Sequence, residues 1–249
     1  MVCERSDEAP PAILLISTGR IWNCFKSFFL TSLFGGCRLR FLLFPYREAP
    51  VKNAAVGLRP HSGWTSLVAV SVERSEPVVL CRERVHLVKI FNYSYRQPYH
   101  TAEKMPLEEG RAFISRVRAE ARTLAYRALR AMEARLREAD YRLTHCGLLL
   151  ASGRELPNLE KILAAHPLIH TADGELFREA LMQASEKCGL KQFQMKEKEL
   201  VGWAAKVLRR KEASLLRQVT EIGKPMGAPW GQDEKFAALV AWVALRETS

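Results

Sequence analysis

The fold is decided by residues 54–90, whose sequence is AAVGLRPHSGWTSLVAVSVERSEPVVLCRERVHLVKI. An apolar run, Leu67–Val70, lies within the stretch Ala54–Val72, and turn-forming residues follow it. A second apolar run covers Pro77–Cys81, and Arg84–Ile90 then alternates between two faces. Short apolar or alternating runs separated by turn residues are typical of β-strands. The stretch therefore predicts three consecutive strands that form a meander.

A polar and aromatic segment at residues 93–105, which we expect to be a loop, leads to a long helix. Pro106 suits the first turn of that helix, and Glu108 and Glu109 would lie near the positive end of its dipole. Its core-facing stripe is predicted from apolar residues at steps of three or four. These are Phe113, Val117, Ala121, Leu124, Ala128, Met132 and Leu136.

The rest of the chain alternates between strand and helix. Cys146–Ala151 is short and continuously apolar, as expected for a strand in the middle of a sheet. We expect a short helix at Leu156–Ala165 that Pro167 terminates, and a second helix that starts near Thr171 or Asp173. The last predicted elements are an edge strand at Leu190–Met195, helices at 197–209 and 211–222, a loop at Gly223–Gly231 and a helix at Asp233–Leu245.

The resulting order, β-β-β-α-β-α-β-α, predicts an α/β fold in which helices flank a mixed sheet. This order resembles the ribonuclease H-like superfamily. The Holliday-junction-resolvase-like branch of that superfamily opens its first strand with a motif of the type Gly-Ile-Asp-Pro-Gly, which GLRPH at residues 57–61 resembles. That branch also closes with an Asp-bearing helix rich in alanine and leucine, which DEKFAAL at residues 233–239 resembles.

The resemblance implies a nuclease site with acidic side chains on the first strand, the fourth strand and the last helix. Such a site holds two divalent ions, because the attacking and the leaving oxygen both need charge stabilisation. At these three places the chain has Arg59, then Ala151–Gly153 with Glu155 as the nearest acid, and Asp233. Arg59 would repel a metal ion, and Asp233 would also serve as a helix N-cap. The sequence therefore predicts a degenerate metal site.

Histidines and acids gather between residues 166 and 179, where His166, His170, Asp173 and Glu175 are the residue types of a metal site. Pro167 is expected to break the register that would place both histidines on one helix face. Acids in a first helical turn also compensate the helix dipole. For a nuclease with rearranged ligands, the predicted metal ligands are Asp173, Glu175 and Asp233, the predicted catalytic residues are Glu155, His170, Glu175 and Asp233, and the cofactor would be Mg²⁺ or Mn²⁺.

Aromatic and cationic residues indicate a nucleic-acid partner. The segment at residues 93–100 interleaves tyrosines with an arginine and a histidine, as single-stranded nucleic acid binding requires, although tyrosines there would also serve packing. The long helix is basic with arginine in place of lysine, which suits bidentate phosphate contacts, although a charge-rich helix face is also typical of simple solvation. The predicted nucleic-acid-binding residues are Arg59, Tyr95, Arg96, Tyr99, Arg118, Arg122, Arg209 and Arg210.

The first 50 residues differ from the rest of the 249-residue chain. Between Pro10 and Arg47 they are apolar and basic without an acid, and no uncharged run is long enough to span a bilayer. We interpret residues 1–50 as an extension outside the fold and residues 51–249 as the ribonuclease H-like domain; a membrane-surface segment or a transit peptide is the alternative. The six cysteines form no framework, so we expect a reducing, cytoplasmic setting.

The charge of the chain is consistent with a polyanionic partner. The formal net charge is +11, and most of the excess lies after residue 50. We therefore expect a basic, ribonuclease H-like module that binds DNA or RNA and whose metal site is degenerate. A metal-dependent nuclease or other hydrolase with rearranged ligands is one alternative, and a protein-interaction scaffold is another.

Overall fold

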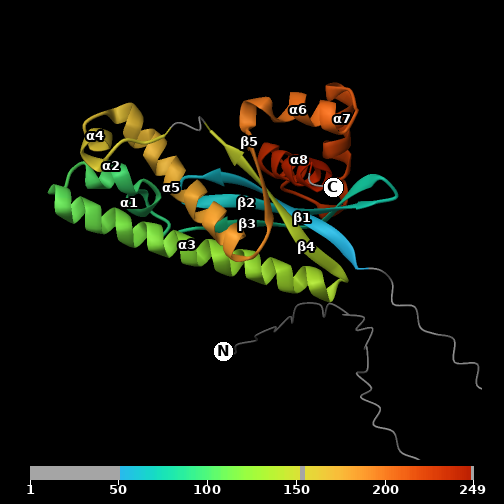
Figure 1. Ribbon diagram of the computed structural model, residues 1–249, viewed down its shortest axis with the longest axis horizontal. Coiled ribbons are helices and arrows are strands. Elements are labelled where there is room, and N and C mark those ends of the chain that lie inside the picture. Colours follow the sequence, from blue (N-terminus) through green and yellow to red (C-terminus); the bar gives the residue numbers. More distant parts are fainter. Residues whose placement is uncertain (1–50, 152–154, 248–249) are drawn as a thin grey trace, which may run out of the picture. The chain divides into compact units, whose positions relative to one another are not determined.

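The computed structural model describes residues 51–151 and 155–247, which form a five-stranded mixed sheet with helices on both faces (Figure 1). The strand order is β3-β2-β1-β4-β5. The first three strands pair antiparallel, and β4 and β5 continue the sheet parallel to β1. This is the α/β arrangement predicted from the sequence, a mixed sheet flanked by helices. The strands are Lys52–His61 (β1), Trp64–Glu73 (β2), Glu76–His86 (β3), Tyr141–Leu150 (β4) and Lys191–Lys196 (β5).

The predicted meander is confirmed, but the predicted ranges of its strands are wrong. The stretch Ala54–Val72 contains both β1 and β2, because His61 pairs with Trp64 across a turn in which Gly63 takes a positive φ of 82°. The run Pro77–Cys81 and the first three residues of Arg84–Ile90, predicted as separate strands, belong to one strand, β3, which ends at His86. This strand lies at the sheet edge and is half-exposed, so its polar residues do not mark a break.

Helix α8 (Gln232–Glu247) packs directly on the backbone of β1 and β4. A Cβ at Gly57 would lie 1.7 Å from the carbonyl oxygen of Ala237, and one at Gly147 would lie 2.6 Å from that of Val240. Only glycine permits so close an approach. One hydrophobic core fills this side of the sheet with residues of α8, α6 (Leu200–Val207) and α7 (Glu212–Glu221). The 3₁₀ turns Glu197–Glu199 (η1) and Lys224–Met226 (η2) connect these elements.

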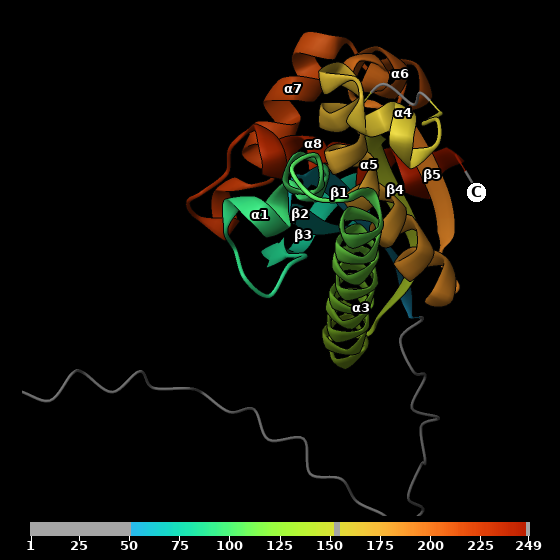
Figure 2. The same ribbon diagram turned by 90° about the vertical axis from the view of Figure 1, so that its left-hand side faces the viewer.

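The opposite face is covered by α3 (Leu107–Glu138) and α5 (His166–Lys187), which pack against each other over a second core (Figure 2). In the predicted stripe, Leu124 and Ala128 are wrong: the fully buried residues are Ala125 and Leu129. Both alternatives are apolar and one step apart, so the spacing alone could not choose between them. The other predicted stripe residues are buried.

Three further corrections concern the helices. The segment predicted as a loop at residues 93–105 contains α1 (Tyr93–Arg96) and α2 (Pro98–Ala102), and the helix predicted at 156–165 is the shorter α4 (Leu159–Leu163). Pro167 does not end a helix, because it occupies the first turn of α5, which begins at His166. Proline fits there since the first N–H groups of a helix have no intrahelical partner.

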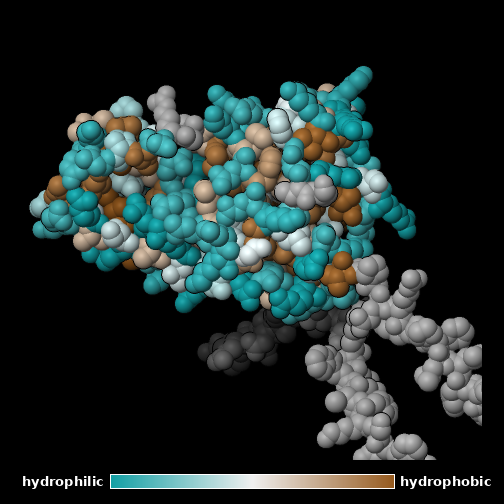
Figure 3. All heavy atoms as spheres, viewed as in Figure 1, coloured by the Kyte–Doolittle hydropathy of each residue, from teal (hydrophilic) through white to brown (hydrophobic). Residues whose placement is uncertain are grey.

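The face of the molecule in Figure 3 is mainly hydrophilic, and its hydrophobic residues form separate groups among hydrophilic ones. Among the described residues, no helix combines the length and the apolar character needed to cross a bilayer. The predicted extension at residues 1–50 lies outside the described residues, as does Ser152.

Candidate functional site

Four side chains meet where β1 ends, and we call them the strand-end network: Arg59, His61, Glu197 and Asp233. Arg59 donates from Nε and Nη2 to the two carboxylate oxygens of Glu197 at 3.0 and 2.7 Å, and it also forms an ion pair with Asp233. Nε2 of His61 lies 2.8 Å from Oδ1 of Asp233. Asp233 reaches Arg59 because α8 lies directly on β1.

The strand-end network places a guanidinium where the resemblance implies a metal ion. Arg59 is the first-strand residue and Asp233 the last-helix residue of that comparison, and the structure brings them into contact. The Arg59 side chain is only 15% exposed and is held by two carboxylates. Its guanidinium is therefore not free to bind a phosphate either. Glu197 was not among the predicted site residues. Its position directly after the edge strand β5 could have indicated that it lies at the strand ends.

His61 is neutral at neutral pH. Burial, with the positive charge of Arg59 next, lowers the pKa of His61 to about 4. A neutral ring can donate Nε2–H to the Asp233 carboxylate. The ring also stacks on Trp64 with centroids 4.1 Å apart, and the Arg84 guanidinium lies 3.6 Å from the Trp64 ring centroid.

A second stack lies beside the first. His86, the register partner of Trp64 in the adjacent strand, stacks on Phe91 with centroids 4.0 Å apart. The Arg96 guanidinium lies 4.6 Å from the Phe91 ring centroid. Tyr93 follows two residues later and is 58% exposed. We call the two stacks together with Tyr93 the aromatic–cationic surface; it comprises His61, Trp64, Arg84, His86, Phe91, Tyr93 and Arg96.

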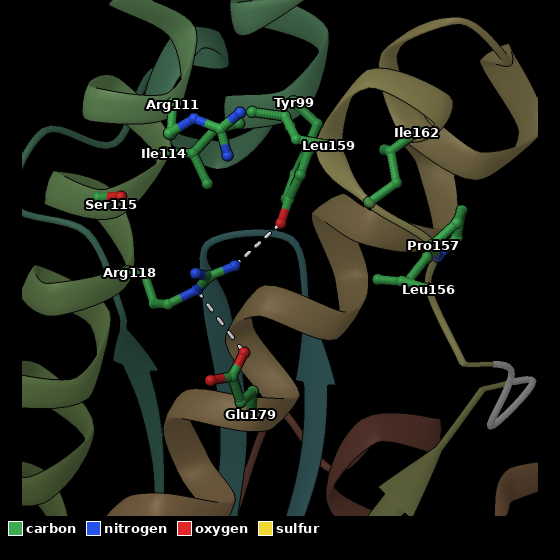
Figure 4. Close-up of a pocket in the computed structure, with 10 residues that line it drawn as sticks. All are labelled: Tyr99, Arg111, Ile114, Ser115, Arg118, Leu156, Pro157, Leu159, Ile162 and Glu179. Atoms are coloured by element: carbon green, nitrogen blue, oxygen red, sulfur yellow. Dashed lines mark hydrogen bonds and ion pairs between the residues drawn. The ribbon is translucent and has the colours of Figure 1, made fainter. Parts of the chain in front are cut away.

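The predicted base-stacking role of Tyr99 is wrong, and that of Tyr95 is weakened. Tyr99 is 4% exposed, and its hydroxyl accepts a hydrogen bond from Nη2 of Arg118 at 3.1 Å (Figure 4). Tyr95 is half-buried, with its ring 5.6 Å from that of Phe113. Composition could not tell these packing tyrosines from the exposed Tyr93.

The predicted arginines of α3 are largely engaged within the protein. Arg118 and Arg122 both pair with Glu179 of α5, at 3.6 and 2.5 Å, and Figure 4 shows the Arg118 contact. In α6–α7, Arg210 donates to Glu76 at 2.8 Å. Arg209, predicted with it, lies just after α6 with a positive φ of 52°. The basic excess read from the sequence is therefore partly neutralised by acids from other elements.

Three imidazoles lie close together, and we call them the histidine cluster: His100, His166 and His170. One nitrogen of each ring lies within 4.8 Å of one nitrogen of the other two. His166 and His170 are one turn apart on α5, with their Nε2 atoms 3.0 Å apart. The prediction that Pro167 separates them is wrong, because a proline in the first turn leaves the helix intact.

Asp173, predicted as a metal ligand, supports the histidine cluster instead. It is 2% exposed; Oδ1 accepts from the backbone N–H of Tyr99 at 2.8 Å and Oδ2 from Nδ1 of His100 at 2.5 Å. Burial raises the pKa of Asp173, while the hydrogen bond from His100 and that from Tyr99 oppose the rise. Both of its oxygens are thus committed to neighbouring groups.

A cleft of about 420 Å³ joins the two groups. It is lined by His61 of the strand-end network and His170 of the histidine cluster, together with Glu175 and Arg178, whose side chains are 3.3 Å apart. The structure therefore brings together the predicted His170 and Glu175, with Asp233 reached through His61. Glu155 lies exposed in the segment after β4, and no contact places it in this cleft.

Similarity to known proteins is found at the level of structure. Neither a protein-family model nor a curated protein matches the sequence. Solved structures similar to this chain include RuvC of Thermus thermophilus, alone (14% identity, 78% of this chain and 95% of that chain, TM-score 0.44) and in complex with Holliday junction substrate (14%, 78% and 94%, 0.45). A third is the yeast mitochondrial Holliday junction resolvase Ydc2 (11%, 79% and 80%, 0.41).

Proposed function

We propose that this domain binds single-stranded nucleic acid on the aromatic–cationic surface. The observation that carries the proposal is the pair of ordered stacks, each of which holds an arginine against an aromatic ring. Guanidinium planes and aromatic rings are the groups on which splayed-out bases stack. The exposed ring of Tyr93 adds a free stacking face beside them.

The charges around the cleft support an anionic ligand. Burial lowers the pKa of His61 most, and the positive charges of Arg59, Arg84 and Arg178 lower it further, while Glu197 opposes the shift. Arg84 is exposed, its guanidinium lies over Trp64, and it pairs with no acid among the residues that the structure describes. An arginine held in this way keeps its N–H groups for a phosphate at little cost in side-chain entropy.

The same contacts argue against a two-metal nuclease at the strand ends. Arg59 compensates the carboxylates of Glu197 and Asp233, which are the acids that could hold a divalent ion there. A metal ion would have to displace a bidentate, mostly buried ion pair. The proposed module therefore binds without the ion chemistry that the resemblance implies.

Binding to a labelled oligothymidylate, followed by fluorescence anisotropy over a range of salt concentrations, tests the proposal. Replacing both Arg84 and Tyr93 with alanine should weaken binding by roughly 10-fold or more, since stacking contributes about 1–3 kcal/mol per base. Matched controls are Arg127→Ala, which removes an exposed arginine of α3, and Trp203→Ala, which removes a 42%-exposed ring of α6. Equal losses in the controls, or no retention of the oligonucleotide, would overturn the proposal and favour a protein-interaction scaffold.

A metal-dependent hydrolase with rearranged ligands is the second candidate. It is favoured by one observation: His170 and Glu175 line the same cleft as His61. This candidate predicts cleavage of a single-stranded oligonucleotide that depends on an added divalent ion and that is abolished by Glu175→Gln. Cleavage that persists in the Glu175→Gln protein, or none with Mg²⁺, Mn²⁺ or Zn²⁺, would exclude it.

A further inference from the structure

We propose that His100, His166 and His170 bind one transition-metal ion of the Zn²⁺ class. The three rings are already close, with centroid separations of 4.4 Å for His100–His170, 4.5 Å for His166–His170 and 5.2 Å for His100–His166. A tetrahedral zinc site with metal–nitrogen bonds of about 2.0–2.1 Å separates its ligand nitrogens by about 3.3 Å. The 3.0 Å between the Nε2 atoms of His166 and His170 needs only a small side-chain adjustment to reach that value.

The backbone holds the three ligands in place from two elements. His166 and His170 lie one turn apart on α5, so their side chains project from the same face of the helix. His100 lies in α2, which packs on α5 and is tied to it by the bond from the Tyr99 N–H to Asp173. The ligands would therefore be largely preorganised, and little chain ordering would accompany metal binding.

Asp173 gives independent support, because a buried carboxylate that orients a histidine is the usual partner of a metal-bound imidazole. Its Oδ2 accepts a hydrogen bond from Nδ1–H of His100, and in this tautomer Nε2 is the ring nitrogen with a free lone pair. Burying a carboxylate costs free energy unless its bonds repay it. Here the two bonds fix one tautomer and one orientation of His100, which is the arrangement a metal site needs.

The ligand set selects the kind of ion. Three imidazoles suit zinc and its neighbours such as cobalt, nickel and copper, whereas magnesium and calcium prefer oxygen ligands. His166 and His170 are exposed, and His170 also lines the cleft, so a fourth position would be open to water or a ligand. Three protein ligands with an open position are typical of catalytic rather than structural zinc sites.

The site is tested with the full chain, freed of any polyhistidine tag and treated with a chelator. Titration with Zn²⁺ against a chromophoric chelator should show one tight site per chain, and Mg²⁺ should not compete. The double variant His166→Ala, His170→Ala should lose at least 100-fold in affinity. His86→Gln, which removes another exposed histidine, should change it less than 2-fold. Because both cluster histidines are exposed, their replacement should leave the fold intact, which circular dichroism checks.

Two further measurements separate this site from other sources of zinc binding. Asp173→Asn should weaken Zn²⁺ by about 10–100-fold, as loss of such a supporting carboxylate typically does. The spectrum of the Co²⁺-loaded protein should lack the intense bands of thiolate ligation, which would instead indicate the cysteines. Thiolate bands, or equal affinity in the wild-type chain and the double variant, would overturn the proposal. Neither measurement involves nucleic acid, so the outcome is independent of the binding function proposed above.

Discussion

The strand-end network and the histidine cluster border the same cleft but differ in how their charges are satisfied. In the strand-end network, Arg59 supplies the cation for Glu197 and Asp233. In the histidine cluster, three rings each bring one nitrogen close to the other two. The carboxylate beside it, that of Asp173, bonds to Nδ1 of His100. The first group is complete without an ion, whereas the second offers donors that an ion would use. Acids at the expected positions therefore do not by themselves indicate where a metal binds.

The largest expected effect comes from Gly57, which allows α8 to bring Asp233 to Arg59. Gly57→Ala should lower the free energy of unfolding by about 3 kcal/mol, because its Cβ would lie 1.7 Å from the Ala237 carbonyl oxygen and α8 would have to move. The matched control is Gly202→Ala in α6, where the nearest atom to the added Cβ is 3.6 Å away. This control should raise stability by up to about 1 kcal/mol. Urea unfolding measures both, and similar effects would show that α8 does not depend on this contact.

The next largest effect is stabilisation of the fold by Zn²⁺. At a free concentration 100 times the dissociation constant, Zn²⁺ should raise the free energy of unfolding by about 2.7 kcal/mol through the histidine cluster. Mg²⁺ should have no such effect, since Arg59 already neutralises the strand-end acids. Thermal unfolding of the wild-type chain and of the His166→Ala, His170→Ala double variant provides the measurement. Stabilisation by Mg²⁺ in place of Zn²⁺ would reverse the roles of the two groups.

Removing the cation of the strand-end network should cost less. Arg59→Met removes the cation that pairs with Asp233 and Glu197. We expect a loss of about 2 kcal/mol, below the value for fully buried pairs because these acids are 29% and 35% exposed. Lys52→Ala, which breaks the more exposed pair with Glu73, should have a smaller effect. The Arg59→Met protein should also gain affinity for Mg²⁺, which calorimetry measures. An unchanged stability would mean that the ion pairs contribute nothing.

The sequence predicted much of the fold because the order of strands and helices along the chain and most of the buried stripe of α3 follow from apolar periodicity. Boundaries failed where the signal was ambiguous, as at the edge strand β3, where exposure hides the alternation, and at Pro167, which fits either end of a helix. Arg59 and Asp233 were placed in the same region from the resemblance, and the structure brings them into contact.

The candidate site was only partly predictable, because its members come from distant segments. His166 and His170 stand close together in the chain, but His100 joins them only through the packing of α2 on α5. Asp173 could be recognised as a polar residue among histidines, yet its role depends on which way its buried carboxylate points. Similarly, Tyr93 and Tyr99 are tyrosines of the same short segment, and only their burial in the fold distinguishes them.

The smallest expected effect is the part of the pH dependence that comes from His61 of the strand-end network. The pKa of His61 is lowered to about 4 in the folded protein, and an unfolded histidine has a pKa of about 6.5. Between these values the unfolded chain binds the proton more readily, so stability should fall as the pH is lowered from about 6.5 to about 4. Because the His61 side chain is 32% exposed, solvent screening should limit the loss to about 1 kcal/mol. Urea unfolding midpoints measured across this range should show a shallower slope for His61→Gln than for the wild-type chain, and His86→Gln serves as the control. Parallel slopes in all three proteins would mean that His61 is not held neutral by burial and the neighbouring arginines.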